Sequence, residues 1–313
     1  MSLGSVLVGA CVGGLGASAA AGEHIHLFVF AGQSNMVGGN PVNAQHAGVL
    51  GLPFEQSLEG INPDWYEPEP DVRYTHRLST INDGGWHELV HHRWNPSGTS
   101  WGPDLPFGHL IHEAWPEANI AVIKTAFGGT ALNSSWLARV GDPDPRFPYE
   151  TLYEDSMEFI YMRVQELLLE GHTVEVEGFF WVQGYGDLGR NSFTNEYQEG
   201  LTELSALVRE DLDVPDLPFF FTRQHINTDE TRAFRLPRFR CEQEQFADSD
   251  PNAYLIDIDD VGFRDNGIHY DGQAAAVMGE RFFQKFIEHE AGTATSDHDS
   301  AETPDPCPEI PEV

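Results

Sequence analysis

Basic side chains are scarce in this 313-residue sequence, which has 17 lysines and arginines against 50 aspartates and glutamates. The formal net charge is -33, and only two residues, Lys124 and Lys285, are lysines. A field of this sign repels phosphate backbones and anionic headgroups, so we expect neither nucleic acid nor a membrane surface as a partner. An acidic, lysine-poor surface also stays soluble in concentrated salt. We therefore hypothesise a saline habitat, which unchanged solubility and activity from no salt to molar salt would contradict.

Cysteine is almost absent too. Cys11, Cys241 and Cys307 are too few for a disulfide framework, and their spacing fits no zinc site. Cys241 and Cys307 could pair only if the end of the chain folds back. The segment 87–91 reads His-Glu-Leu-Val-His and matches a zinc motif that requires a helix, but the glycines and prolines around it leave little room for one. We interpret the match as chance and expect neither a metal nor an organic cofactor.

The two ends of the chain differ from its middle. Residues 2–21 are small and apolar and end in three alanines, which predicts a signal peptide over residues 1–21 and a secreted or periplasmic protein. No basic residue precedes the apolar run, and residues 8–11 resemble a lipoprotein cleavage site, so a lipid anchor at Cys11 stays an alternative. Residues 292–313 are acidic and rich in proline, and we expect a disordered tail there.

The middle, residues 22–291, has the pattern of one α/β domain. Apolar runs rich in β-forming residues predict strands at 25–31, 120–125, 176–182, 217–222 and 254–258. Apolar residues at helical spacing predict helices over 149–170, 195–212 and 272–289. This alternation predicts a parallel sheet covered on both faces, with ligands bound beyond the carboxyl ends of its strands. The segment 40–108, rich in proline, glycine and tryptophan, is expected to form loops and short strands along one wall of a cleft.

Ser34 follows the first predicted strand directly, in the segment Gly-Gln-Ser-Asn-Met at residues 32–36. A serine at this edge, beside a glycine that permits a tight turn, can act as a nucleophile, and the next residues can offer backbone N–H groups to an oxyanion. A serine that merely caps a helix is the alternative. His269 lies in the loop before the last predicted helix, from which it can reach Ser34 as a general base.

Two glycine-containing segments follow other predicted strands. One carries Gly-Gly-Thr at residues 128–130, where glycine lets the backbone approach a ligand closely, and the other carries Trp-x-Gln-Gly-x-x-Asp at residues 181–187. Together with the serine segment, Trp-Gly-Pro at 101–103 and His-x-Asp at 269–271, this order resembles the SGNH hydrolases. Within them it is most similar to the sialate O-acetylesterase-like group, which includes carbohydrate esterase family six. The resemblance covers residues 24–289.

The resemblance implies a flavodoxin-like three-layer α/β/α sandwich around a five-stranded parallel sheet. It implies a metal-independent serine esterase that removes acetyl groups from sugars or polysaccharides, with Ser34 as nucleophile and His269 as base. It also implies an oxyanion hole made of the Ser34 and Gly129 backbone N–H groups and the Gln183 side-chain amide. The sequence carries no signal for oligomeric state.

Two departures from the family pattern concern the acid behind His269. The family places an aspartate three residues before the histidine, where this chain has Asn266, and Asp265 stands one residue further back. The glutamate that serves as the acid in some relatives is replaced by Tyr185. Three interpretations follow: Asp265 shifts in, which we favour, Asp187 substitutes, or a Ser–His pair acts with weaker support.

The same departures leave a second hypothesis open, a carbohydrate-binding protein that kept the fold and lost turnover. Four tryptophans are candidate stacking surfaces for sugar rings, although most tryptophans are simply packed in cores. They are Trp86, Trp94, Trp101 and Trp136.

Overall fold

We describe the fold from a computed structural model of the chain. The structure describes residues 22–38, 62–78, 81–82, 84–90, 92–95, 98–139, 151–225, 230–263 and 268–311. The predicted signal peptide and its lipoprotein alternative at Cys11 lie outside these ranges. Among the described residues, no helix combines the length and the apolar character needed to cross a bilayer.

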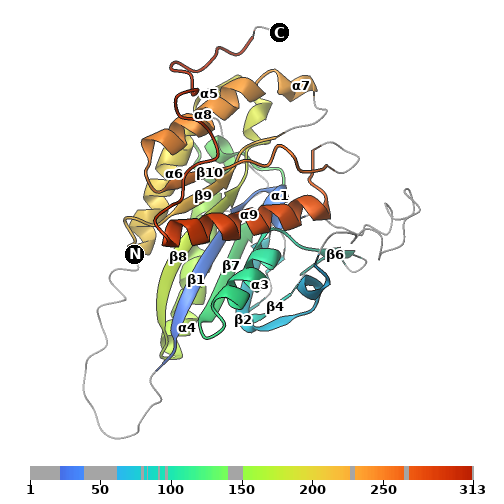
Figure 1. The fold of residues 1–313 in the computed structure, drawn as a ribbon, viewed down its shortest axis with the longest axis vertical. Coiled ribbons are helices and arrows are strands. Elements are labelled where there is room, and N and C mark those ends of the chain that lie inside the picture. The colour runs from blue at the N-terminus through green and yellow to red at the C-terminus, as the bar shows by residue number, and fades with distance from the viewer. Residues whose placement is uncertain are drawn as a thin grey trace, which may run out of the picture.

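The centre of the molecule is one twisted sheet, whose described part contains six parallel strands (Figure 1). In sheet order these strands are β10 (Ala253–Ile256), β9 (Phe219–Thr222), β8 (Thr173–Val182), β1 (His24–Gly32), β7 (Asn119–Ala126) and β2 (Glu69–Leu78). The short strands β3 (Ile81–Asn82) and β4 (His87–Leu89) pair antiparallel with β2. A separate ribbon consists of β5 (His92–Asn95) and β6 (Gly98–Ser100).

Each of the five predicted runs corresponds to one parallel strand, but the expected count of five is wrong. The sixth strand, β2, lies inside the segment that was expected to be loops and short strands. Its sequence, Glu-Pro-Asp-Val-Arg-Tyr-Thr-His-Arg-Leu, is too polar to read as a buried run. Only part of it faces the core, through Val72, Tyr74 and Leu78. A strand outside the sheet's centre needs less apolar sequence than one buried on both faces, which is why its pattern is weak.

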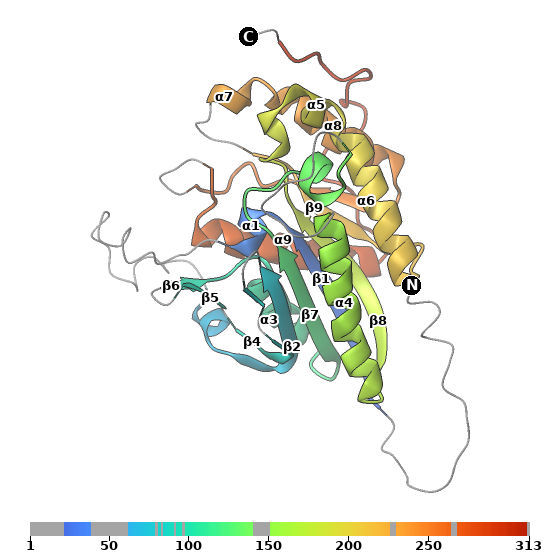
Figure 2. The same ribbon diagram turned by 180° about the vertical axis from the view of Figure 1, so that it is seen from behind.

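Helices cover both faces of the sheet, which confirms the expected α/β class. The face seen in Figure 1 carries α3 (Asp104–Ala114) and α9 (Gly272–Glu290). The face seen in Figure 2 carries α4 (Leu152–Leu169) and α6 (Tyr197–Leu212), with α8 (Leu236–Ser249) packed beside α6. These include the three predicted helices. The shorter elements are α1 (Ser34–Val37), α5 (Asn191–Asn195), α7 (Glu230–Ala233), η3 (Pro63–Tyr66), η4 (Leu132–Trp136) and η5 (Asp187–Gly189).

Aromatic side chains fill the core between the sheet and α9. The rings of Phe30, Phe180 and Phe220 stack across three neighbouring strands, with centroids 4.5 Å and 4.9 Å apart. Phe282 of α9 meets Phe180 edge-on at 5.3 Å. All four side chains are fully buried, and each contributes about 1.5–3 kcal/mol to stability. This packing holds β1, which leads directly to Ser34, in place between its neighbouring strands and α9.

The structure differs from the expected disordered tail over residues 292–311. A disulfide joins Cys307 to Cys241 on α8, and Cys307 is buried. Nearer the end of α9, the Lys285 ammonium donates to Asp297 and to the Thr295 carbonyl, both at 2.7 Å. The acidic, proline-rich composition correctly indicates that this segment forms no core of its own. Its order comes from a covalent bond and polar contacts with the domain, which composition does not encode.

Candidate active site

Ser34 lies just beyond the carboxyl end of β1 and is the first residue of α1. β1 sits at the point where the strand order reverses, with β7 on one side and β8 on the other, which is where open α/β sheets bind ligands. The turn requires glycine at position 32, because its φ is +150° and a Cβ there would lie 2.2 Å from the Val182 carbonyl oxygen. The Gln33 N–H donates to that same carbonyl at 3.0 Å, so the turn is tied to β8.

His269 meets the serine as predicted, although 235 residues separate the two in the sequence. Its Nε2 lies 3.0 Å from Ser34 Oγ, within hydrogen-bond distance. A bridge between Phe263 and Tyr270 closes the loop that carries it, and α9 begins immediately afterwards with Asp271 capping the Ala274 N–H at 2.8 Å. The serine hydroxyl and the imidazole are therefore arranged as a nucleophile and a general base.

Asn35 connects these two segments, a role that the sequence analysis missed. Its Oδ1 accepts from the Tyr270 N–H at 3.2 Å, and its Nδ2 donates to the Ile268 carbonyl at 3.4 Å. The amide thus grips the backbone on both sides of His269, while its own backbone follows Ser34. The sequence offered one signal for this role, the place of Asn35 next to Ser34, since an asparagine side chain can bond to backbone groups. It could not show which backbone groups, because they lie more than 230 residues away in the chain.

The Ser34 backbone N–H is placed to stabilise an oxyanion. Within the part of the chain that the structure describes, this N–H meets no acceptor, and the Gln33 side chain does not cap α1. The glycine loop after β7 lies beside it, because the Phe127 N–H donates to the Gly32 carbonyl at 2.9 Å. A Cβ added to Gly128 would come within 3.8 Å of Ser34 Cβ. Gly129, the predicted second donor, follows with a φ of +71° that favours glycine.

Gln183, the third predicted donor, is arranged differently from the prediction. Its buried Nε2 contacts three acceptors: Asp187 Oδ2 at 2.7 Å, the Thr130 carbonyl at 3.2 Å and Gln33 Oε1 at 3.3 Å. Its Oε1 accepts from the Tyr197 hydroxyl at 2.8 Å. Since an amide has only two protons, both are engaged inside the protein. Gln183 therefore links β8 to the segments that carry Gln33 and Thr130, and so supports the turn before Ser34.

Asp187 is fully buried and joins Gln183 to the start of η4. Besides Gln183 it binds the N–H groups of Leu132 at 2.7 Å and Asn133 at 3.1 Å, at the start of η4. Burial raises the pKa of Asp187 to about 6, although the three N–H donors lower it. None of these three donors is His269, and they take three of the about four acceptor positions of the carboxylate, so the structure disfavours Asp187 as the acid behind His269. The other candidates, Asp265 and Asn266, lie outside the described residues.

A buried ion pair lies beneath α1. The Lys124 ammonium donates to Asp104 Oδ1 at 2.7 Å and to the Val37 carbonyl, the last residue of α1, at 3.0 Å. Asp104 Oδ2 accepts from the Tyr74 hydroxyl at 2.8 Å, so β2 also contributes. Burial lowers the pKa of Lys124, and the Asp104 carboxylate opposes that shift. The pair connects α1, which begins with Ser34, to β7 and α3.

The motif at residues 87–91 does not form the helix that a zinc protease needs. Residues 87–89 are strand β4, and His91 lies outside the described residues. Two of the tryptophans proposed as sugar-stacking surfaces are core residues, since Trp101 and Trp136 are buried. Trp86 is half-buried and packs against the core, and the structure does not describe the Trp94 side chain.

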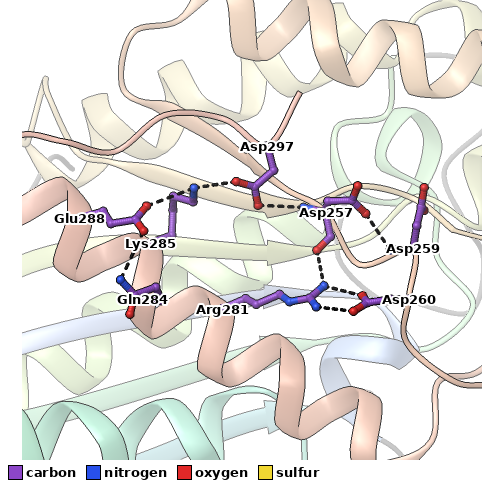
Figure 3. Close-up of a pocket in the computed structure, with 8 residues that line it drawn as sticks. All are labelled: Asp257, Asp259, Asp260, Arg281, Gln284, Lys285, Glu288 and Asp297. Atoms are coloured by element: carbon purple, nitrogen blue, oxygen red, sulfur yellow. Dashed lines mark hydrogen bonds and ion pairs between the residues drawn. The ribbon is translucent and has the colours of Figure 1, made fainter. Parts of the chain in front are cut away.

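The pocket drawn in Figure 3 lies between α9 and the segment after β10, and neither Ser34 nor His269 lines it. Its volume is about 460 Å³, and it is lined mainly by charged side chains. Arg281 binds Asp260 through two contacts of 2.6 Å and 2.7 Å, and Lys285 binds Asp297 (Figure 3). Because its cations already pair with its carboxylates, we interpret this pocket as structural.

Comparison with known proteins identifies the family and the fold of the chain. The sequence matches the family described as "Carbohydrate esterase, sialic acid-specific acetylesterase" over residues 24–288, and no curated protein matches it significantly. Its structure is similar to that of a protein from Arabidopsis thaliana, with a TM-score of 0.61, 19% identity and coverage of 84% of this chain and 98% of that one.

Two further solved structures share the fold. NanS has a TM-score of 0.59 and 15% identity, with 87% of this chain and 99% of that chain covered. A carbohydrate acetylesterase from Xanthomonas citri has a TM-score of 0.56 and 16% identity, with 84% and 55% covered. At such identities the structural likeness speaks for the fold, whereas the family match rests on the sequence.

Proposed function

The chain belongs to the sialic acid-specific acetylesterase family of carbohydrate esterases, so it is a carboxylic ester hydrolase, and we propose that it deacetylates sugars through an acyl-enzyme on Ser34. The observation that carries this proposal is the 3.0 Å contact between Ser34 Oγ and His269 Nε2, beside a Ser34 N–H that no described residue engages. A nucleophile, a base and an oxyanion donor therefore lie together at the carboxyl end of β1.

The reaction begins when Ser34 Oγ attacks the acetyl carbonyl and its proton passes to His269 Nε2. Negative charge develops on the carbonyl oxygen, where the N–H groups of Ser34 and Gly129 would stabilise it, each by about 3 kcal/mol. As the C–O bond to the sugar breaks, the imidazolium returns the proton to the departing sugar oxygen. Water then attacks the acetyl-serine with His269 again as base, which releases acetate and restores Ser34.

Asp265 is our assignment for the acid that orients the His269 ring, with Asn266 as the neutral alternative. The argument against Asp187 is that its carboxylate bonds to Gln183, Leu132 and Asn133 and not to His269. Turnover of Asp265→Ala, Asn266→Ala and Asp187→Ala compared at equal folded concentration tests the assignment. Asp265→Ala should lose most of the kcat, and near-wild-type activity in that variant would refute it.

Acetylated sugars or polysaccharides outside the cytoplasm are the substrates that we propose. The apolar residues 2–21 support export, and so does the disulfide between Cys241 and Cys307, since such bonds persist in oxidising compartments. N-terminal sequencing of the protein recovered outside the cytoplasm should begin close to Gly22. An intact N-terminus on cytoplasmic protein would contradict export.

The primary test is hydrolysis of p-nitrophenyl acetate and of acetylated sugars by the wild type and by Ser34→Ala. We expect turnover with the wild type, none with the variant, and an acetyl adduct on Ser34 in rapidly quenched protein. Saturable glycan binding without turnover in the wild type would refute the proposal and support the binding-protein hypothesis instead.

A further inference from the structure

A fully buried lysine lies beneath α1, the helical turn that begins with Ser34. The Lys124 side chain is 0% exposed, and that of its partner Asp104 is 2% exposed. The sequence contains only one other lysine, Lys285. Moving an ammonium and a carboxylate out of water is costly, and yet a chain with few basic residues has one at this position. Packing alone does not account for a charge in this place.

Stability alone does not account for the pair either. Apolar side chains of similar volume often replace a buried ion pair without loss of stability, and sometimes with a gain. A buried pair can instead fix one arrangement of the segments around it, because its hydrogen bonds are directional and costly to leave unmade. The segments that Lys124 and Asp104 bind therefore indicate the role of the pair.

The ammonium binds the end of α1. Lys124 Nζ donates to the Val37 carbonyl at 3.0 Å and to Asp104 Oδ1 at 2.7 Å. Asp104 Oδ2 accepts from the Tyr74 hydroxyl at 2.8 Å. Tyr74 lies on β2, Lys124 on the neighbouring strand β7, and Asp104 is the first residue of α3. The last carbonyl of α1 is thereby connected to two strands and a helix.

Because α1 is a single helical turn, a shift at its end is passed to its beginning. The Ser34 carbonyl accepts from the Gly38 N–H at 3.0 Å, and the Gln33 carbonyl accepts from the Val37 N–H at 3.0 Å. Val37 is thus bonded on one side to the residue before Ser34 and on the other to Lys124. The direction of the Ser34 hydroxyl and N–H groups therefore depends on where the ammonium holds the Val37 carbonyl.

The backbone of residues 101–102 encloses the same end of α1. At Gly102, an added Cβ would lie 2.4 Å from the Met36 carbonyl oxygen and 2.9 Å from Lys124 Nζ. At Gly38, whose φ is +103°, an added Cβ would lie 2.0 Å from the Trp101 carbonyl oxygen. Glycine at both positions lets the two backbones approach this closely. A displacement of α1 toward this segment would meet backbone, which cannot yield as a side chain can.

We propose that Lys124, held by Asp104, is a positioning residue for ester hydrolysis, because it fixes α1 so that the Ser34 hydroxyl faces His269. The inference rests on the proposed function, in which Ser34 is the nucleophile. Lys124 acts through the Val37 carbonyl and not on the reacting atoms. A misplacement of about 1 Å can lower the rate about 100-fold, so a small shift of α1 is sufficient for a large effect.

The test measures p-nitrophenyl acetate hydrolysis by the full-length variants Lys124→Met/Asp104→Asn and Asp104→Asn. The double variant removes the donor to Val37 and leaves no buried charge without its partner. The single variant keeps the Lys124 nitrogen, which can still donate to Val37 as a neutral amine. We expect the double variant to lose about 10- to 100-fold in kcat with KM within about twofold of the wild type, and Asp104→Asn to lose clearly less.

Three further readouts separate positioning from stability and from charge. The double variant should have a higher Tm than Lys124→Met, since no unpaired charge remains. Its pH–rate profile should keep the limbs of the wild type, because neutral side chains replace a pair that is neutral as a whole. The matched control Lys285→Met removes the other buried lysine, about 20 Å along α9 from the helix start beside His269, and should keep the kcat of the wild type.

A folded double variant with the kcat of the wild type would overturn the proposal, as would equal kcat values of the double variant and Asp104→Asn. A shifted pH–rate profile would also overturn it, since the pair would then act through charge. If the double variant does not fold, Tyr74→Phe decides by removing the hydroxyl that holds Asp104: a kcat lowered about threefold supports the proposal, and an unchanged kcat overturns it. A wild type without turnover, or an active Ser34→Ala, would instead refute the proposed function.

Discussion

Replacing Asn35 with alanine removes the two hydrogen bonds by which its side chain holds the backbone on both sides of His269. The variant loses a hydrogen bond of 3.2 Å from the Tyr270 N–H and a longer one of 3.4 Å to the Ile268 carbonyl. Asn35 is 6% exposed, so water does not readily replace the lost acceptor. Leaving a buried N–H unsatisfied costs about 1–3 kcal/mol.

We expect much of this cost to raise the free energy of the transition state, because the amide holds the backbone on both sides of His269, the proposed base. A loss of about 2 kcal/mol corresponds to roughly a 30-fold fall in kcat/KM. The fall should lie in kcat, since Asn35 positions His269 and has no described role in holding substrate. The assay is p-nitrophenyl acetate hydrolysis with thermal unfolding of the same samples.

Two further variants make this prediction specific. Asn119→Ala removes a comparable side-chain bond, 3.3 Å to the His24 carbonyl, at the far end of β1, and should leave kcat unchanged. Asn35→Asp keeps the acceptor for Tyr270 and adds a negative charge near His269. That charge favours the imidazolium, so the acid limb of the pH–rate profile should move to higher pH. A kcat of Asn35→Ala equal to that of Asn119→Ala would show that Asn35 does not position His269.

Three other predictions concern stability. The pKa of Asp187 is raised to about 6 in the folded protein, against 3.8 when unfolded, so its contribution to folding stability is fully present below pH 3.8 and is lost as the pH rises through 6, a change of about 3 kcal/mol. Urea unfolding of the wild type from pH 4 to 7 should show this loss, and Asp187→Asn should not. Equal pH dependence of the two proteins would contradict the prediction. Lys124→Met leaves Asp104 buried without its cation and should cost about 3–5 kcal/mol, measured by chemical unfolding, whereas an unchanged midpoint would mean that the pair is not buried as described. Cys307→Ser removes a disulfide between residues 66 apart in the sequence and should lower the free energy of unfolding by up to about 4 kcal/mol. Reduction of the wild type should cause the same loss. A reduced wild type as stable as the oxidised one would show that stability does not depend on the disulfide.

Local patterns predicted much of the fold correctly because buried strands and the buried faces of helices leave regular apolar patterns in the sequence. The strands around Phe30, Phe180 and Phe220 are recognisable in the sequence as continuous apolar runs. The long helices are recognisable as apolar residues at helical spacing. Strand β2 escaped this reasoning because it lies outside the centre of the sheet. The ordered tail escaped it because Cys307 acts through a partner 66 residues away.

The sequence alone predicts an ester hydrolase, which the family match confirms, and it predicts Ser34 as the nucleophile and His269 as the base because both residues follow strand ends. Which residues support this pair follows only from the contacts in the folded protein. In the structure, Gln183 donates to groups inside the protein in place of an oxyanion, Asp187 accepts from three N–H groups, and Asn35 bonds to the backbone beside His269. The physical reason is that a hydrogen bond between distant segments depends on which groups the fold brings within about 3 Å, and a motif specifies the residues but not their partners.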